Sequence, residues 1–221
     1  AALILITNFP QENAQKMDMS PIWKKAISGV VLFLKNRNLR AILSLNMVIA
    51  TSGAMILVNS VTIIQGFFGL SENKLAIAML CYGTGAMLSA FVVFIKSGNS
   101  DYKRIMLMGA FLTSLTSLSS IFIQSYEALL LSWSCFGFLS SFILVPIGQI
   151  LREETNVNDR TAIFGAQFSL SHACWLISYP LIGYLLVFGG LKISFLIIAI
   201  LVLITTSVAW YLWHSSSVNL S

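Results

Sequence analysis

The chain has 221 residues, of which 57% are hydrophobic and 10% charged, whereas a soluble domain carries about 25% charged residues. This composition excludes an ordinary soluble domain, and the net charge of +5 does not indicate a nucleic-acid partner, because in a membrane protein the distribution of basic residues matters more than their sum. Cys81, Cys135 and Cys174 lie in separate apolar segments, without the spacing of a disulfide framework, a zinc site or a redox pair. We expect a multi-pass protein of the lipid bilayer with no metal and no cofactor.

The first 39 residues are interpreted as a linker. AALILI, residues 1–6, is too short for the apolar region of a signal peptide, and we expect it to be the inner end of a preceding transmembrane helix. Ser20 and Pro21 then form a plausible cap and first turn of a helix. Its apolar residues Trp23, Ala26, Ile27, Val30 and Leu34 recur at helical spacing, and Lys24, Lys25, Ser28 and Lys35 fall largely elsewhere. This pattern predicts an amphipathic helix lying on the membrane.

Residues 40–213 are expected to form an all-α bundle of six transmembrane helices, followed by a cytoplasmic tail at 214–221. Each apolar run has about the length that crosses the roughly 30 Å hydrocarbon core. Short stretches rich in Gly, Asn and charged residues separate the runs. The predicted spans are 41–65, 75–95, 105–123, 128–150, 161–187 and 191–213.

Basic residues predict the orientation of this bundle, since short loops rich in Lys and Arg stay on the cytoplasmic side. Residues 7–40, 96–104 and 151–160 together hold eleven of the thirteen basic residues, and the alternate loops hold only Lys74 and Lys192. Both ends of the six-helix unit are therefore expected in the cytoplasm. All acidic residues also fall in loops, so His172 is left as the ionisable candidate for a coupling site within these spans. No catalytic arrangement is visible, and we do not expect an enzyme.

Two segments carry a family resemblance. LNMVIATSGAMILVNSVTIIQGFFGLSENKLAIAMLCYGTGAMLSAFV (45–92) and LREETNVNDRTAIFGAQFSLSHACWLISYPLIGYL (151–185) resemble helices seven and eight, and helix eleven with its preceding loop, of the major facilitator superfamily. The second segment resembles bacterial drug, nickel or siderophore exporters. The resemblance implies the carboxyl-terminal half of a secondary transporter in the bacterial inner membrane. It would move a small solute by alternating access, and export is the expected direction.

The resemblance also implies that four spans, 41–65, 75–95, 128–150 and 161–187, line the substrate path. Candidate path residues on these spans are Ser52, Asn59, Gln149, Gln167 and His172. Each has an alternative role in helix packing, because a buried amide or imidazole must find a partner. For His172 packing is slightly favoured over proton or metal binding, and for Asn59 cavity lining is slightly favoured.

Small residues and a proline suggest packing contacts and hinges. Gly83, Gly85 and Gly183 allow close approach of helices, and Pro180 is expected to kink its helix. On the same helix Gly165, Ser169, His172, Leu176 and Tyr179 share one side, for which close helix packing is the favoured use. In the loop between helices eight and nine, members of the family often carry a Gly-x-x-x-Asp-basic-x-Gly-basic-basic turn. The loop SGNSDYKRI lacks the full set of glycines of this turn. Gate candidates on the cytoplasmic side are Asp101, Arg104, Arg152, Glu153 and Arg160, with Glu154 and Asp159 in the same loop; a solvated loop is the alternative.

Half a carrier encloses no path, and its polar side would face lipid at high cost. We therefore expect a missing amino-terminal six-helix half or a second copy of this chain as partner. The alternatives are an orphan or decayed half-transporter without activity, or a membrane interaction module whose basic linker, residues 16–40, binds anionic lipid or a cytoplasmic protein.

Overall fold

The computed structural model describes residues 22–95 and 101–214. The expected helix end at residues 1–6, the cap at Ser20 and Pro21, and the tail after His214 lie outside these residues. Within the described part, every regular element is helical, which confirms the all-α fold class.

Six long helices and three short helical segments follow one another. They are α1 (Ile22–Lys35), α2 (Arg37–Val61), the π-helical η1 (Thr62–Phe67), α3 (Glu72–Ile95), α4 (Tyr102–Ser119), the 3₁₀ segment η2 (Ser120–Phe122), α5 (Tyr126–Glu153), the 3₁₀ segment η3 (Val157–Asp159) and α6 (Arg160–His214). The helix α6 consists of two spans joined at Gly190, whose φ of 71° and ψ of −179° interrupt the helical backbone. With this division, the structure has six helices long enough to cross a bilayer.

Polar side chains fix several helix starts. The side-chain oxygen of Asn36 accepts from the backbone N–H groups of Asn38 and Leu39 at 2.8 and 3.3 Å, so α1 ends and α2 begins at this residue. Asp101 and Ser125 cap α4 and α5 in the same way. Such side chains satisfy the N–H groups that a helix leaves free at its first turn.

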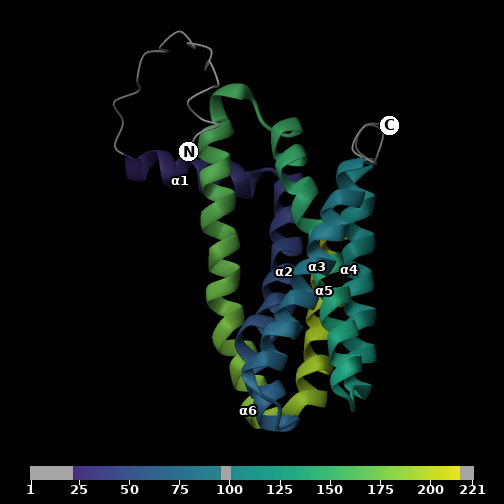
Figure 1. Ribbon diagram of the computed structural model, residues 1–221. Helices are drawn as coiled ribbons and strands as arrows, with labels where there is room; N and C mark the ends of the chain where they lie inside the picture. Colours follow the sequence, from purple (N-terminus) through teal and green to yellow (C-terminus); the bar gives the residue numbers. More distant parts are fainter. Residues whose placement is uncertain (1–21, 96–100, 215–221) are drawn as a thin grey trace, which may run out of the picture.

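The spans stand side by side, and α1 runs across one end of the bundle (Figure 1). The helix α2 packs against α6, α3 packs against α5, and α4 packs against both α5 and α6. Trp133 and Phe136 of α5 and Phe195 of α6 make ring contacts with centroids 6.3 to 6.4 Å apart in the core. We call the end that carries α1 and the loop 154–159 the basic end.

Burial is uneven among the spans. In the most apolar stretch of Arg37–Phe67, 72% of residues are buried, against 22% in Glu72–Val93. The helix α2 is therefore central, whereas α3 touches the rest of the bundle along one side. A span with so little burial must contact lipid or another protein along its remaining surface.

Candidate functional site

The contact between α2 and the first half of α6 holds several of the predicted path residues. The amide of Asn46 donates to the side-chain oxygen of Gln167 at 3.2 Å. Toward the other end, Asn59 donates to the backbone carbonyl of Ile182 at 3.1 Å. These two amide contacts tie the helices together at separate depths.

Two predicted path residues of α2 are buried within the bundle. Asn59 is 2% exposed, and its amide joins α2 to α6 through the carbonyl of Ile182. Ser52 is also buried, and its hydroxyl donates to the carbonyl of Val48 at 2.7 Å. Both side chains meet the requirement that a buried polar group be hydrogen-bonded.

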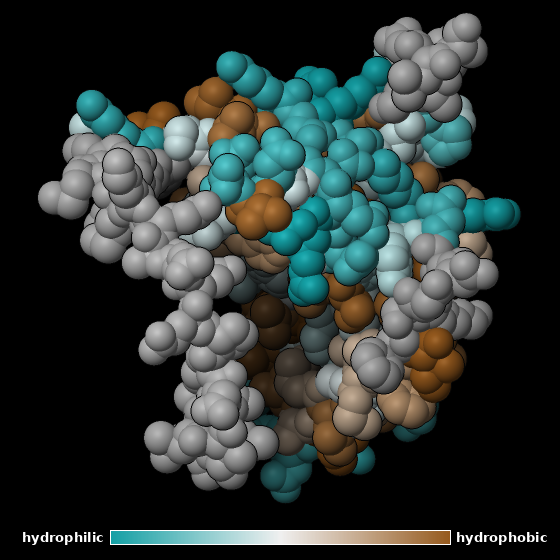
Figure 2. Space-filling view, turned by 90° about the horizontal axis from the view of Figure 1, so that it is seen from above, coloured by the Kyte–Doolittle hydropathy of each residue, from teal (hydrophilic) through white to brown (hydrophobic). Residues whose placement is uncertain are grey.

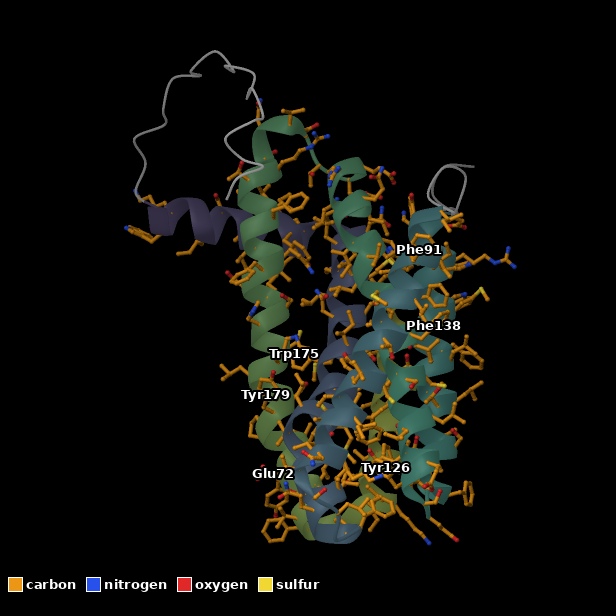
Figure 3. The ribbon with its side chains drawn as sticks, viewed as in Figure 1. Glu72, Phe91, Tyr126, Phe138, Trp175 and Tyr179 are labelled. Carbon is orange, nitrogen blue, oxygen red and sulfur yellow. The ribbon has the colours of Figure 1, made fainter. Side chains whose placement is uncertain are left out.

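An aromatic side chain closes the α2–α6 contact between the two amide pairs. A Cβ atom placed on Gly53 would lie 2.3 Å from the Trp175 ring, so the indole fits only because residue 53 is glycine. Trp175 extends from α6, and its ring centroid is 5.2 Å from that of Tyr179 (Figure 3). Nothing in the spacing of the sequence singles out Trp175, since the notch at Gly53 belongs to a distant helix.

His172 lies on the outer side of α6 and is exposed. Its Nδ1 is 2.8 Å from the carbonyl oxygen of Phe168, and since a carbonyl only accepts, Nδ1 carries the proton and donates. The imidazole also contacts the Phe168 ring, with centroids 4.1 Å apart. This geometry leaves Nε2 as the nitrogen that can accept a proton or a hydrogen bond from outside the bundle.

Small residues beside His172 share this exposure. Gly165 and Ser169 lie on the same side of α6, and a Cβ atom added to Gly165 would meet no neighbouring atom. Close helix packing is the favoured use of this side of α6, but no described helix packs against Gly165. Gly83 of α3 is likewise exposed with open space beside it.

Gly85 shows the packing that small residues permit. A Cβ atom on Gly85 would lie 2.1 Å from the backbone oxygen of Ser134, and one on Gly137 would lie 2.0 Å from that of Tyr82. The backbones of α3 and α5 thus touch through a reciprocal pair of glycines. Gly183 makes only ordinary contact with Val58.

Prolines lie within two of the spans. Pro180 is exposed, and α6 continues through it until Gly190. Pro146, which we did not single out, lies buried inside α5. The interruption of α6 is therefore at the glycine, which can adopt a positive φ, and not at the proline.

Two serine hydroxyls of α4 form hydrogen bonds to the second half of α6. Ser114 and Ser117 donate to the backbone oxygens of Ala199 and Phe195 at 3.2 and 3.1 Å. Thr113, by contrast, bonds back to Gly109 of its own helix. Hydroxyls of α4 thus bond either to their own helix backbone or to the backbone of α6.

Glu154 joins three elements at the basic end. Its carboxylate accepts from Asn38 at 2.7 Å and forms an ion pair of 3.2 Å with Lys103. Its backbone oxygen accepts from Asn36 at 3.4 Å. One residue after α5 therefore fastens the start of α2 and the start of α4.

The predicted gate residues make more local contacts. Asp101 caps α4 by accepting from the backbone N–H of Arg104 at 3.3 Å. Arg160, the first residue of α6, donates to the backbone oxygen of Arg152, near the end of α5, at 3.2 Å. Glu153 accepts from the side-chain amide of Gln149 at 2.8 Å. Gln149, a predicted path residue, is exposed near the end of α5. The sequence predictions do not include Asn36 and Asn38. A sequence signal for them exists, because Asn directly before an apolar run is a helix-start pattern.

Viewed from the basic end, the molecule shows a polar surface with a hollow of hydrophobic walls beside it (Figure 2). Formal charges of the described residues stay at helix ends and in loops. The helices thus carry aromatic rings, amides, hydroxyls and two imidazoles, those of His172 and, at the end of α6, His214.

Carriers built from repeated six-helix units have the same number of spans in each unit. The sequence profile of the Major Facilitator Superfamily matches residues 42–219. The chain therefore belongs to this superfamily, whose members are transporters and not enzymes, and it is a multi-pass membrane protein. Among curated proteins, none matches the chain.

Proposed function

We propose that this chain forms one side of a solute path and works by alternating access against a second six-helix unit. The observation that carries the proposal is that two polar side chains of α6, Ser169 and His172, are exposed on the bundle surface next to Gly165. Polar groups facing lipid are costly. A second unit covering this side, either a separate amino-terminal half or another copy of the chain, would remove that cost.

The chemistry of this side supports a role for His172 at the path. With Nδ1 donating to Phe168, Nε2 is the nitrogen left to accept a proton. Imidazole is the usual proton carrier among side chains. Export of a small solute across a bacterial inner membrane, with both ends in the cytoplasm, follows from the subgroup resemblance and the basic loops and is part of the proposal.

Labelling with a membrane-impermeant maleimide tests whether this side borders water. Ser169→Cys is made in a chain whose Cys81, Cys135 and Cys174 are replaced by serine, and vesicles of both orientations are labelled. A path predicts modification of position 169, because maleimide reacts with the hydrated thiolate. Leu196→Cys is the control, since residue 196 is exposed on the second half of α6 and is expected to face lipid. Equal absence of label at both positions would reject the path.

A further inference from the structure

The helix α1 has two distinct apolar sides. Gly29 and Phe33 are buried, and a Cβ atom on Gly29 would lie 2.4 Å from the backbone oxygen of Ala162. This side is therefore seated against the start of α6. The contact is backbone to backbone and depends on the missing side chain of glycine.

The second apolar side is exposed. Trp23 is 60% exposed and Ile27 is 56% exposed, and both share this side with Val31 and Leu34. A row of large apolar side chains open to water is rare on a soluble surface. Its position across the ends of the spans (Figure 1) places it at the depth where the bilayer surface begins.

Basic side chains border this exposed row. Lys24 and Lys35 are exposed, and the Lys24 ammonium lies 5.6 Å from the centroid of the Trp23 ring. Among the described residues of α1, no acidic side chain opposes them. A helix with an apolar side and adjoining lysines matches the interface between acyl chains and anionic headgroups.

We propose that α1 binds an anionic lipid surface and, through Gly29, holds the start of α6 to that surface. Lipid composition would thereby act on the helix that carries His172. The ligand is the phosphate headgroup of an anionic lipid, together with the apolar layer beneath it. The inference does not depend on transport activity, because both the binding and the coupling can be measured directly.

Hydrogen exchange of the full chain in nanodiscs tests the binding. The discs contain either phosphatidylcholine alone or phosphatidylcholine mixed with phosphatidylglycerol. Each basic residue near an anionic surface contributes about fivefold in binding, so Lys24 and Lys35 together are expected to slow exchange of the α1 amides about 25-fold in the mixed discs. The variant Lys24→Gln/Lys35→Gln should lose this part of the difference, while Lys25 stays in place.

A matched variant separates local charge from total charge. Lys74→Gln/Lys192→Gln removes the same charge from residues outside the basic end and should keep the full response of α1. Exchange that is independent of phosphatidylglycerol in the unsubstituted chain would overturn the proposal, as would equal loss in both double variants. A protein partner for this side, not lipid, would then be the interpretation.

The substitution Gly29→Leu tests the coupling. A leucine at this position separates α1 from α6 but leaves the exposed row and the lysines in place. The α1 amides should still respond to phosphatidylglycerol, whereas the amides of residues 164–167 in α6, which respond in the unsubstituted chain, should cease to do so. A persistent response at residues 164–167 would show that Gly29 does not transmit it.

Discussion

The carboxylate of Glu154 makes contacts that its sequence neighbour does not. It is 22% exposed and binds both Asn38 and Lys103, whereas Glu153 contacts Gln149 on its own helix. A hydrogen bond to a charged group contributes about 1.5–3 kcal/mol, and an exposed contact within one helix contributes about 0.5 kcal/mol or less. The difference should be visible in single variants.

We predict that Glu154→Ala lowers the free energy of unfolding by about 2 kcal/mol and Glu153→Ala by less than about 0.5 kcal/mol. Unfolding of each variant in detergent measures both. A double-mutant cycle with Lys103→Met should give a coupling energy of about 0.5 kcal/mol or more. Equal losses at the two glutamates would contradict the special position of Glu154.

Single residues also show where sequence reasoning stops. The sequence predicts that Asn59 and His172 lie within spans, because hydropathy locates the spans. It does not predict that the amide is buried and the imidazole exposed, because that depends on which side of each helix its neighbours occupy. The partner of Asn59, the carbonyl of Ile182, is a backbone atom and leaves no mark in the sequence.

At the scale of elements, two glycines of α3 differ in their contacts with α5, although the sequence predicts the same packing role for both. Gly83 and Gly85 are two residues apart, so they project from nearly opposite sides of the helix. One faces open space and the other touches the backbone of α5. We predict opposite effects of the same substitution.

Gly85→Ala should lower the free energy of unfolding by about 1–3 kcal/mol, because an added methyl group forces the two backbones apart. Gly83→Ala should leave it unchanged or raise it by up to about 1 kcal/mol, since alanine favours the helix and has room. Thermal unfolding of the full chain in detergent compares the two. A larger loss at Gly83 would reject the described packing of α3 on α5.

The spans themselves were predictable to within a few residues. Their lengths follow from the thickness of the hydrocarbon core, and the breaks follow from Gly, Asn and charged residues. The break between the predicted spans 161–187 and 191–213 contains Gly190, and glycine adopts the positive φ found there without strain. The π-helical extension Thr62–Phe67 was not predictable, since its residues TIIQGF are compatible with an ordinary last turn.

For the whole molecule, charge and packing point to different surfaces. In the described part of the chain, the basic residues of 22–40, 101–104 and 151–160 lie at one end of the bundle, where Glu154 contacts both Asn36 and Lys103. The uncovered sides of α3 and α6 run along the spans, at right angles to that end (Figure 1). The sequence predicted the first surface through the distribution of charge. It could not predict the second, because helices with similar hydropathy differ in how much of their surface their neighbours cover.

The charged end sets the orientation in the membrane, since translocation of short basic loops is disfavoured. We predict that Asn158→Cys, in the loop of the basic end, reacts with impermeant maleimide in inside-out vesicles but not in intact cells. Asn73→Cys, at the start of α3 and at the opposite end, should react in intact cells. Both are made in the chain without native cysteines. The reverse pattern would show that the basic end lies outside, and would also place α1 on the leaflet opposite to the one expected.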